Sequence, residues 1–104
     1  MKLLDLIFKE FFAIVKYLEK NFAIENGRII INSKIFYTML DKNLYIKRKE
    51  KLDFYRDFNL IICNSNSYAA VIYDKETKKL CRKVILNYTL YRTLKKLSET
   101  EISI

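Results

Sequence analysis

Hydrophobic side chains dominate the start of the chain and leave only a narrow polar stripe. Residues 3–20 contain no helix breaker, and Asp5, Lys9, Lys16 and Lys20 recur along one side at spacings of four and seven. This pattern predicts a long apolar helix with more hydrophobic surface than one small core buries. Self-association is the simplest way to cover the excess, through an expected dimer interface formed by Leu4, Phe8, Phe11, Phe12 and Val15.

Two other arrangements of this helix stay open. It can lie at the centre of its own domain, surrounded by the remaining elements. A helix lying on a membrane surface is disfavoured, because its polar face carries as many acids as lysines.

A strand and two further helices follow. The turn signal Asn26–Gly27 precedes the β-branched run 28–31, which predicts a strand, and Asn32 or Ser33 can cap the next helix. That helix is expected over Ser33–Asn43, with a compact apolar face. After a short turn, a basic helix is expected over Lys47–Phe58, with apolar residues three positions apart on the face that packs on the core.

The second half of the chain predicts a β-hairpin and a last helix. Asn59 is expected to end the basic helix in the left-handed conformation, and a short strand follows at residues 60–63. The β-rich runs 68–73 and 79–86 flank a polar tip at 74–78 and predict a hairpin. Asn87 can cap a final helix that ends at Ser98. The chain is therefore expected to form one α+β domain over residues 1–98, followed by a flexible acidic tail over 99–104.

Positive charge is concentrated in the middle of the chain. The formal net charge is +8, and residues 28–97 hold sixteen basic and six acidic residues. This localisation favours a polyanionic partner. The alternative is a solvated, lysine-rich surface of the kind that an AT-rich coding source produces.

Composition disfavours several functional classes. There is no His, and Cys63 and Cys81 have no CxxC spacing, so neither a zinc site nor a disulfide framework is indicated and no cofactor is expected. Both thiols are expected to be buried and reduced, in a cytoplasmic protein. No apolar run is long enough to span a membrane, and the N-terminus does not resemble a secretory signal. No acid–base pair has a convincing spacing, Ser65 and Ser67 look like turn residues, and an RNA-processing enzyme or toxin is the weakest hypothesis.

The basic residues of two segments are the candidate DNA contacts. Lysines in the hairpin would neutralise phosphates or enter a narrow, negative AT-rich minor groove. Arg82, Arg48 and Arg56 are the candidates for reading bases, because a guanidinium can bond two acceptors in one plane. Lys34 could hold a phosphate together with the first-turn amides of its helix. The full set of expected contacts is Lys75, Thr77, Lys78, Lys79, Arg82 and Lys83 in the hairpin, Lys47, Arg48, Lys49, Lys51 and Arg56 in the basic helix, and Lys34.

The element order α-β-α-α-β-β-α, over residues 3–97, resembles the winged helix-turn-helix family. The most telling segment is Phe54–Ile61, in which an aromatic helix end, an Asn and a Leu-Ile pair lead toward the wing. The resemblance implies a helix-turn-helix formed by Ser33–Asn43 and Lys47–Phe58, a wing over Tyr68–Leu86, and a dimer on DNA. Asp53 and Asp57 near the reading side of the helix shift the expected contacts toward the wing. Size and composition also resemble the small winged-helix accessory proteins of clostridial conjugative plasmids, the TcpK type.

These observations lead to one functional hypothesis and one rival. The protein is expected to be a cytoplasmic, dimeric, sequence-specific binder of AT-rich double-stranded DNA. It would mark a plasmid origin of transfer for conjugation or act as a transcriptional regulator, alongside other DNA-processing proteins. The rival is a phage- or plasmid-encoded interaction module or inhibitor that presents its basic surface to an acidic protein. Sequence preference for duplex DNA distinguishes the two.

Overall fold

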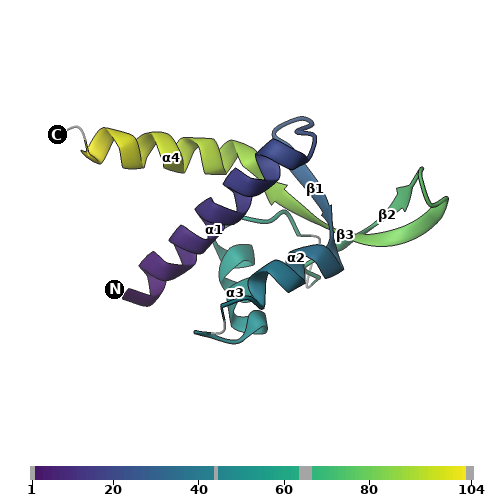
Figure 1. The fold of residues 1–104 in the computed structure, drawn as a ribbon, viewed down its shortest axis with the longest axis horizontal. Coiled ribbons are helices and arrows are strands. Elements are labelled where there is room, and N and C mark those ends of the chain that lie inside the picture. The colour runs from purple at the N-terminus through teal and green to yellow at the C-terminus, as the bar shows by residue number, and fades with distance from the viewer. Residues whose placement is uncertain (1, 44, 64–66, 103–104) are drawn as a thin grey trace.

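The computed structural model describes residues 2–43, 45–63 and 67–102, and within these ranges it has four helices and one small antiparallel sheet (Figure 1). The fold is α+β, and its elements follow one another in the order that the sequence predicts. In chain order they are α1 (Lys2–Asn21), β1 (Arg28–Asn32), α2 (Ser33–Leu40), α3 (Arg48–Asp57), β2 (Ala70–Asp74), β3 (Lys79–Asn87) and α4 (Tyr88–Ile102).

Strand β3 is the middle strand of the sheet, whose order is β1-β3-β2. Its C-terminal half pairs with β1, with Ile31 opposite Val84, and its N-terminal half pairs with β2, with Tyr73 opposite Leu80. An isolated bridge from Ile61 to β3 extends the β2 edge toward the core. Because β1 and β2 pair with different halves of β3, the β2–β3 hairpin projects beyond the rest of the sheet (Figure 1).

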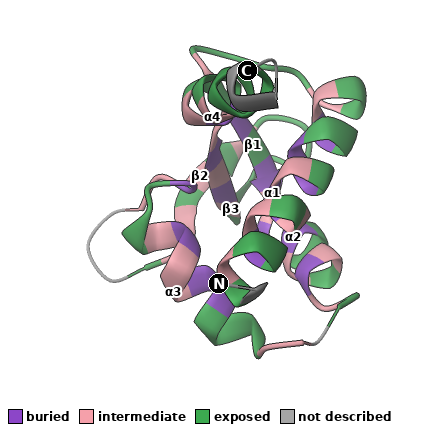
Figure 2. Cartoon of the chain, turned by 90° about the vertical axis from the view of Figure 1, so that its left-hand side faces the viewer, coloured by how far each residue is buried: buried purple, intermediate pink, exposed green. Residues whose placement is uncertain are grey.

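One face of the sheet is buried under the helices, and the other is open. In β1 burial alternates along the strand, so that Ile29 and Ile31 are buried while Ile30 between them is exposed. Val84 and Leu86 of β3 lie on the same buried face. All four helices add side chains to this core, including Phe11, Val15 and Leu18 of α1, Phe36 and Leu40 of α2, Leu52 and Tyr55 of α3, and Tyr91 of α4 (Figure 2).

Local signals placed the turns and helix starts correctly. Asn26, Gly27 and Asn59 all have positive φ, at 52°, 71° and 58°, as their residue types allow. The Asn32 side chain accepts a hydrogen bond from the Lys34 amide at 2.9 Å. Asn87 likewise accepts from the Leu90 amide at 3.0 Å, which confirms the cap predicted for the last helix.

The expected dimer interface on α1 is wrong for two of its five residues. Phe11 and Val15 are completely buried inside the domain, because the helical repeat turns them toward the sheet and α3. Phe8 packs edge-on against Phe54 of α3, with ring centroids 5.5 Å apart. Phe12 contacts Tyr91 of α4 in the same way at 5.7 Å. Leu4 is half-buried. The alternative of a helix enclosed by its own domain therefore describes most of this apolar face.

Three further expectations need correction or fall outside the described residues. Helix α4 continues to Ile102, so residues 99–102 are helical where a flexible tail was predicted; residues 103–104 lie outside the described ranges. Cys63 and Cys81 are free but only half-buried, and Cys63 follows the isolated bridge instead of lying in a strand. Burial raises the pKa of the Cys63 thiol. The turn expected at Ser65 also lies outside the described ranges.

None of the four helices, over the residues that the structure describes, combines the length and the apolar character that crossing a bilayer requires.

Candidate nucleic-acid interface

Arg48, at the start of α3, is held by the end of α2. Its Nε donates to Asp41 Oδ1 at 3.0 Å and its Nη2 donates to Asp41 Oδ2 at 2.9 Å. The guanidinium also lies over the Tyr37 ring, 5.0 Å from the centroid. Both bidentate bonding and stacking are interactions that Arg would otherwise offer to a base edge. In this arrangement Arg48 links the end of α2 to the start of α3, and a DNA base would have to compete with Asp41 for its guanidinium.

Lys51 was expected on the DNA-binding surface, and this is wrong, because its side chain is 0% exposed. Its ammonium donates to Glu10 Oε2 of α1 at 2.9 Å, to the Leu40 carbonyl at 2.7 Å and to the Asn43 carbonyl. The Tyr45 ring closes the site, 4.4 Å from Nζ. Lys51 therefore joins α1, the α2–α3 turn and α3, and it is a structural residue.

Tyr45 and Glu10 extend this buried cluster. The Tyr45 hydroxyl donates to Glu10 Oε1 at 3.3 Å. Burial, followed by the neighbouring Glu10 carboxylate, raises the pKa of Tyr45 to about 12. Glu10 thus accepts from an ammonium with one oxygen and from a phenol with the other, which satisfies a carboxylate that has little contact with water.

Arg56 and Lys49 are engaged with the acidic residues of their own helix. Lys49 Nζ lies 3.1 Å from Asp53 Oδ2, and Arg56 lies 3.4 Å from both Asp53 and Asp57. The Tyr68 hydroxyl donates to Asp53, and the Arg56 guanidinium lies 5.4 Å from the centre of the Tyr68 ring. Hydrogen bonds from Tyr68 and then Lys49 lower the pKa of Asp53. Because Tyr68 precedes β2, this group ties the last turns of α3 to the base of the hairpin.

The hairpin tip presents its cations to solvent. Lys75, Lys78, Lys79 and Arg82 are exposed, and no side-chain hydrogen bond or ion pair joins any of them to another described residue. We call these four residues the hairpin cations. Lys83 differs, since it is half-buried and its Nζ lies 3.7 Å from Asp74 Oδ2. The hairpin cations therefore remain available to an external anion.

The tip is held in shape by its own backbone. Asp74 Oδ1 accepts from the Glu76 amide at 3.0 Å, and this hydrogen bond lowers the pKa of Asp74. The Lys78 amide donates to the Asp74 carbonyl at 2.7 Å and closes the loop. Thr77, an expected contact, is exposed, and its Oγ1 lies 3.8 Å from Cys81 Sγ.

Lys78 has a φ of 58°, in the left-handed region. The other positive-φ residues among those described are Asn or Gly, the types that adopt this conformation at least cost. A lysine here has a conformational cost that Gly would avoid.

Lys34 and Lys47 complete the predicted set. Both are exposed, and neither side chain is paired within the described part of the chain. The Lys34 amide is already bonded to Asn32, so one of the amides expected to hold a phosphate is occupied. Lys47 is the N-cap residue of α3, but its side chain makes no capping hydrogen bond. It directly precedes Arg48, which pairs with Asp41.

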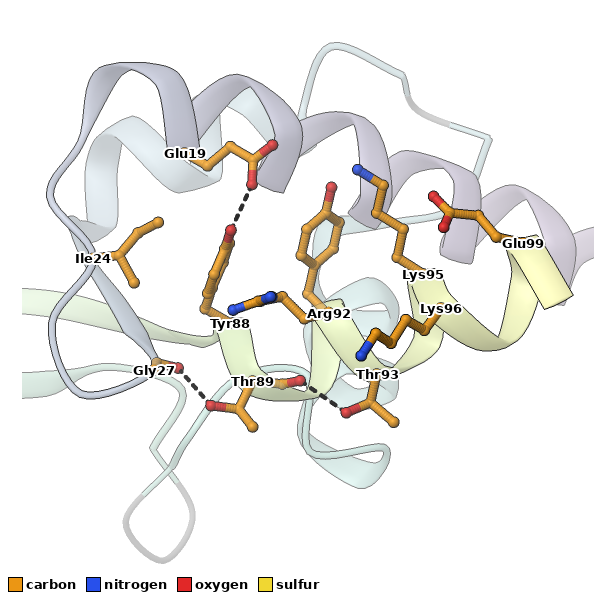
Figure 3. A pocket seen from close by; sticks show the side chains of 11 residues that line it. Glu19, Ile24, Gly27, Tyr88, Thr89, Arg92, Thr93, Lys95, Lys96 and Glu99 are labelled. Atoms are coloured by element: carbon orange, nitrogen blue, oxygen red, sulfur yellow. Dashed lines mark hydrogen bonds between the residues drawn. The ribbon is translucent and has the colours of Figure 1, made fainter.

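The distant partners of the basic helix were missed by sequence reasoning. Glu10 pairs with Lys51, Asp41 pairs with Arg48, and Tyr68 bonds to Asp53, and these three residues come from separate segments. The i, i+4 spacing of Lys49 and Asp53 and the i, i+3 spacing of Asp53 and Arg56 were visible as local signals. A groove of about 560 Å³ lies elsewhere, between α1 and α4 (Figure 3). Its lining includes Glu19, which accepts from the Tyr88 hydroxyl at 2.7 Å, and it contains none of the predicted DNA contacts.

No protein-family model matches the chain, and no curated protein matches it.

Proposed function

We propose that this protein binds double-stranded DNA with sequence preference, as a winged helix-turn-helix protein. In this proposal α2 and α3 are the helix-turn-helix, and the β2–β3 hairpin that follows α3 is the wing. The element order, the sheet order β1-β3-β2 and the projection of the hairpin beyond the sheet support this assignment.

The hairpin cations carry the proposal. Four exposed positive groups lie within eight residues of one projecting hairpin, and no described side chain neutralises them. A polyanion that binds here releases counterions at each neutralised phosphate, which is the main source of affinity for DNA. By contrast, Arg48 and Arg56 already bond to carboxylates, so the wing is the principal contact and α3 a secondary one.

The role of the helix-turn-helix is then to set the angle of approach. Lys34 and Lys47 can each meet a phosphate, and contacts of this kind fix orientation without reading sequence. Two copies would double the phosphate contacts and favour paired half-sites. An AT-rich operator or a plasmid origin of transfer is the class of target that we propose.

Selection of duplexes from a random pool tests the function. We expect a short motif to be enriched by the purified protein, and the enrichment to disappear in the triple variant Lys78→Ala, Lys79→Ala, Arg82→Ala. The matched control removes three exposed cations from α1, with Lys9, Lys16 and Lys20 changed to Ala, and should retain the motif. Sequence-indifferent binding that vanishes at physiological salt would contradict the proposal and favour an acidic protein partner.

A further inference from the structure

The β2–β3 hairpin exposes three large apolar side chains on one face. Leu80 is 71% exposed, Val71 60% and Tyr73 56%. Tyr73 is opposite Leu80, and Val71 is opposite Arg82. Residues directly opposite each other in an antiparallel pair point to the same face, so these four side chains form one surface. We call this surface, formed by Val71, Tyr73, Leu80 and Arg82, the hairpin wedge.

The wedge continues the buried face of the sheet. Along β3 the residues at positions 80, 82, 84 and 86 share one side, and the last two of them are buried in the core. The hairpin extends past the helices that cover this face (Figure 1). The same side that packs on helices near the core is therefore bare toward the tip, and it faces the side of the sheet on which the helices lie.

The charges around the wedge indicate which kind of partner suits this surface. Arg82 belongs to the wedge, and Lys75, Lys78 and Lys79 lie at its outer end. A second copy placed face to face would bring two sets of cations together, which is unfavourable. A DNA minor groove instead offers phosphates on both rims and sugars along its walls, and a base step that opens exposes apolar base faces. Proteins that bind the minor groove use this combination, with cations on the backbone and an apolar side chain inserted at a base step.

We propose that the hairpin wedge enters the minor groove and bends the duplex, with Leu80 and Tyr73 against a partly unstacked base step. This inference rests on the proposed DNA binding and adds a mechanical consequence to it. Flexible pyrimidine–purine steps, such as TA, resist unstacking least, so the wedge also contributes sequence preference. Arg82, on the same face as the apolar side chains, meets a phosphate at the rim of the opened groove.

Förster resonance energy transfer between two dyes on a duplex tests whether the wedge bends DNA. The probe is a duplex of about 30 base pairs with a central TA step in an AT-rich tract and a dye at each end, a length over which a bend changes the end-to-end distance. We expect saturating wild-type protein to bring the dyes closer. The double variant Leu80→Ser, Tyr73→Ser should still bind, up to about tenfold more weakly, with an unchanged salt dependence and with most of the bend lost.

Two controls separate the apolar contribution from charge and from general surface effects. Lys79→Gln should keep the bend at saturation. It should also reduce the magnitude of the slope of log affinity against log salt by about 1, the change expected for the loss of one phosphate contact. Leu97→Ser, at an exposed apolar position of α4, should change neither quantity. Circular dichroism of each variant shows whether it is folded.

Three outcomes would overturn the inference. The dye distance could stay that of free DNA under saturating wild-type protein, or the double variant could bend DNA as the wild type does. The double variant could also change the sedimentation of the free protein, in which case the wedge is a contact between copies. If the wild type binds no duplex at all, the proposed function fails with the wedge, whereas binding without bending overturns the wedge alone.

Discussion

The basic helix segment 47–56 and the hairpin segment 75–83 each contain five lysines and arginines, but they use them in opposite ways. In the helix segment, four of the five side chains bond to carboxylates of their own chain, and Lys51 is completely buried. In the hairpin, only Lys83 has such a partner among the described residues. Equal charge in the sequence therefore does not mean equal charge available to a ligand.

The difference has a structural cause. Segment 47–56 packs against α1 and α2, so Glu10 and Asp41 come within reach, and its own helical repeat brings Asp53 beside Lys49. The hairpin projects beyond these elements, and its two acids, Asp74 and Glu76, lie at the turn itself. Packing therefore brings carboxylates of α1 and of the α2–α3 turn to the cations of the helix segment, whereas the hairpin lies beyond these carboxylates.

Removal of the buried ammonium should have the largest effect. Lys51→Met leaves the Glu10 carboxylate buried without its cation, and we expect the free energy of unfolding to fall by about 3–5 kcal/mol. The double variant Glu10→Leu, Lys51→Met should recover most of this loss, because both charges are then absent. Lys79→Met in the hairpin should change stability by less than about 0.5 kcal/mol. Urea denaturation measures all three variants, and a similar loss of stability at positions 51 and 79 would show that Lys51 is no more structural than a hairpin cation.

High pH should weaken the helix cluster next. The pKa of Tyr45 is raised to about 12, above its ordinary value of about 10, so the folded state favours the protonated phenol. The resulting stability is fully present below about pH 10 and is lost as the pH rises from 10 toward 12. Tyr45→Phe has no phenol to ionise and should lose less stability over this interval than the wild type. Denaturation at pH 9 and at pH 11.5 checks this, and equal losses in the two proteins would contradict it.

Release of a paired arginine should strengthen DNA binding modestly. Asp41→Asn removes the partner that holds Arg48, and we expect duplex affinity to rise about two- to fivefold, in line with the free energy of an exposed ion pair. Asp5→Asn, at an exposed position of α1, makes the same change in net charge and should raise affinity less. An equal rise in both variants would mean that net charge alone matters and that pairing does not disable the helix.

The smallest effect is expected at the hairpin tip, where stability and binding should change in opposite directions. Lys78→Gly relieves the left-handed backbone and should stabilise the protein by about 0.5–1 kcal/mol. The same change removes one hairpin cation, so duplex affinity should fall. Thermal denaturation and a binding titration measure the two quantities. A variant that gains stability without losing affinity would show that the Lys78 charge does not contribute to DNA binding.

Features set by neighbouring residues could be predicted from the sequence. The element order, the Asn32 and Asn87 caps and the left-handed Asn59 all depend on local patterns, and the structure has them. The end of α4 could not be predicted in this way, since residues 99–102 show no apolar repeat. An apolar periodicity also cannot tell which hydrophobic face is covered by the same domain, and this is why Phe11 and Val15 were assigned to a dimer.

Long-range partners decided the pairing of Arg48 and Lys51, and no local pattern reveals those partners. The ligands of Lys51 come from Glu10 in α1 and from Leu40 and Asn43 at the end of α2 and in the turn that follows it. A lysine at that position looks like any other cation of a basic helix until the chain is folded. The bare apolar face of the hairpin was equally hidden, because Val71, Tyr73 and Leu80 have the alternation of an ordinary half-buried strand.

The salt dependence of duplex binding for two matched variants tests whether DNA contacts the hairpin cations in preference to the paired cations of α3. Lys78→Gln, Lys79→Gln removes two hairpin cations, and Arg48→Gln, Lys49→Gln removes two paired cations of the helix. We expect the slope of log affinity against log salt to decrease in magnitude by about 2 in the hairpin variant and by less than about 0.5 in the helix variant. A larger decrease in the helix variant would show that DNA contacts α3 in preference to the hairpin.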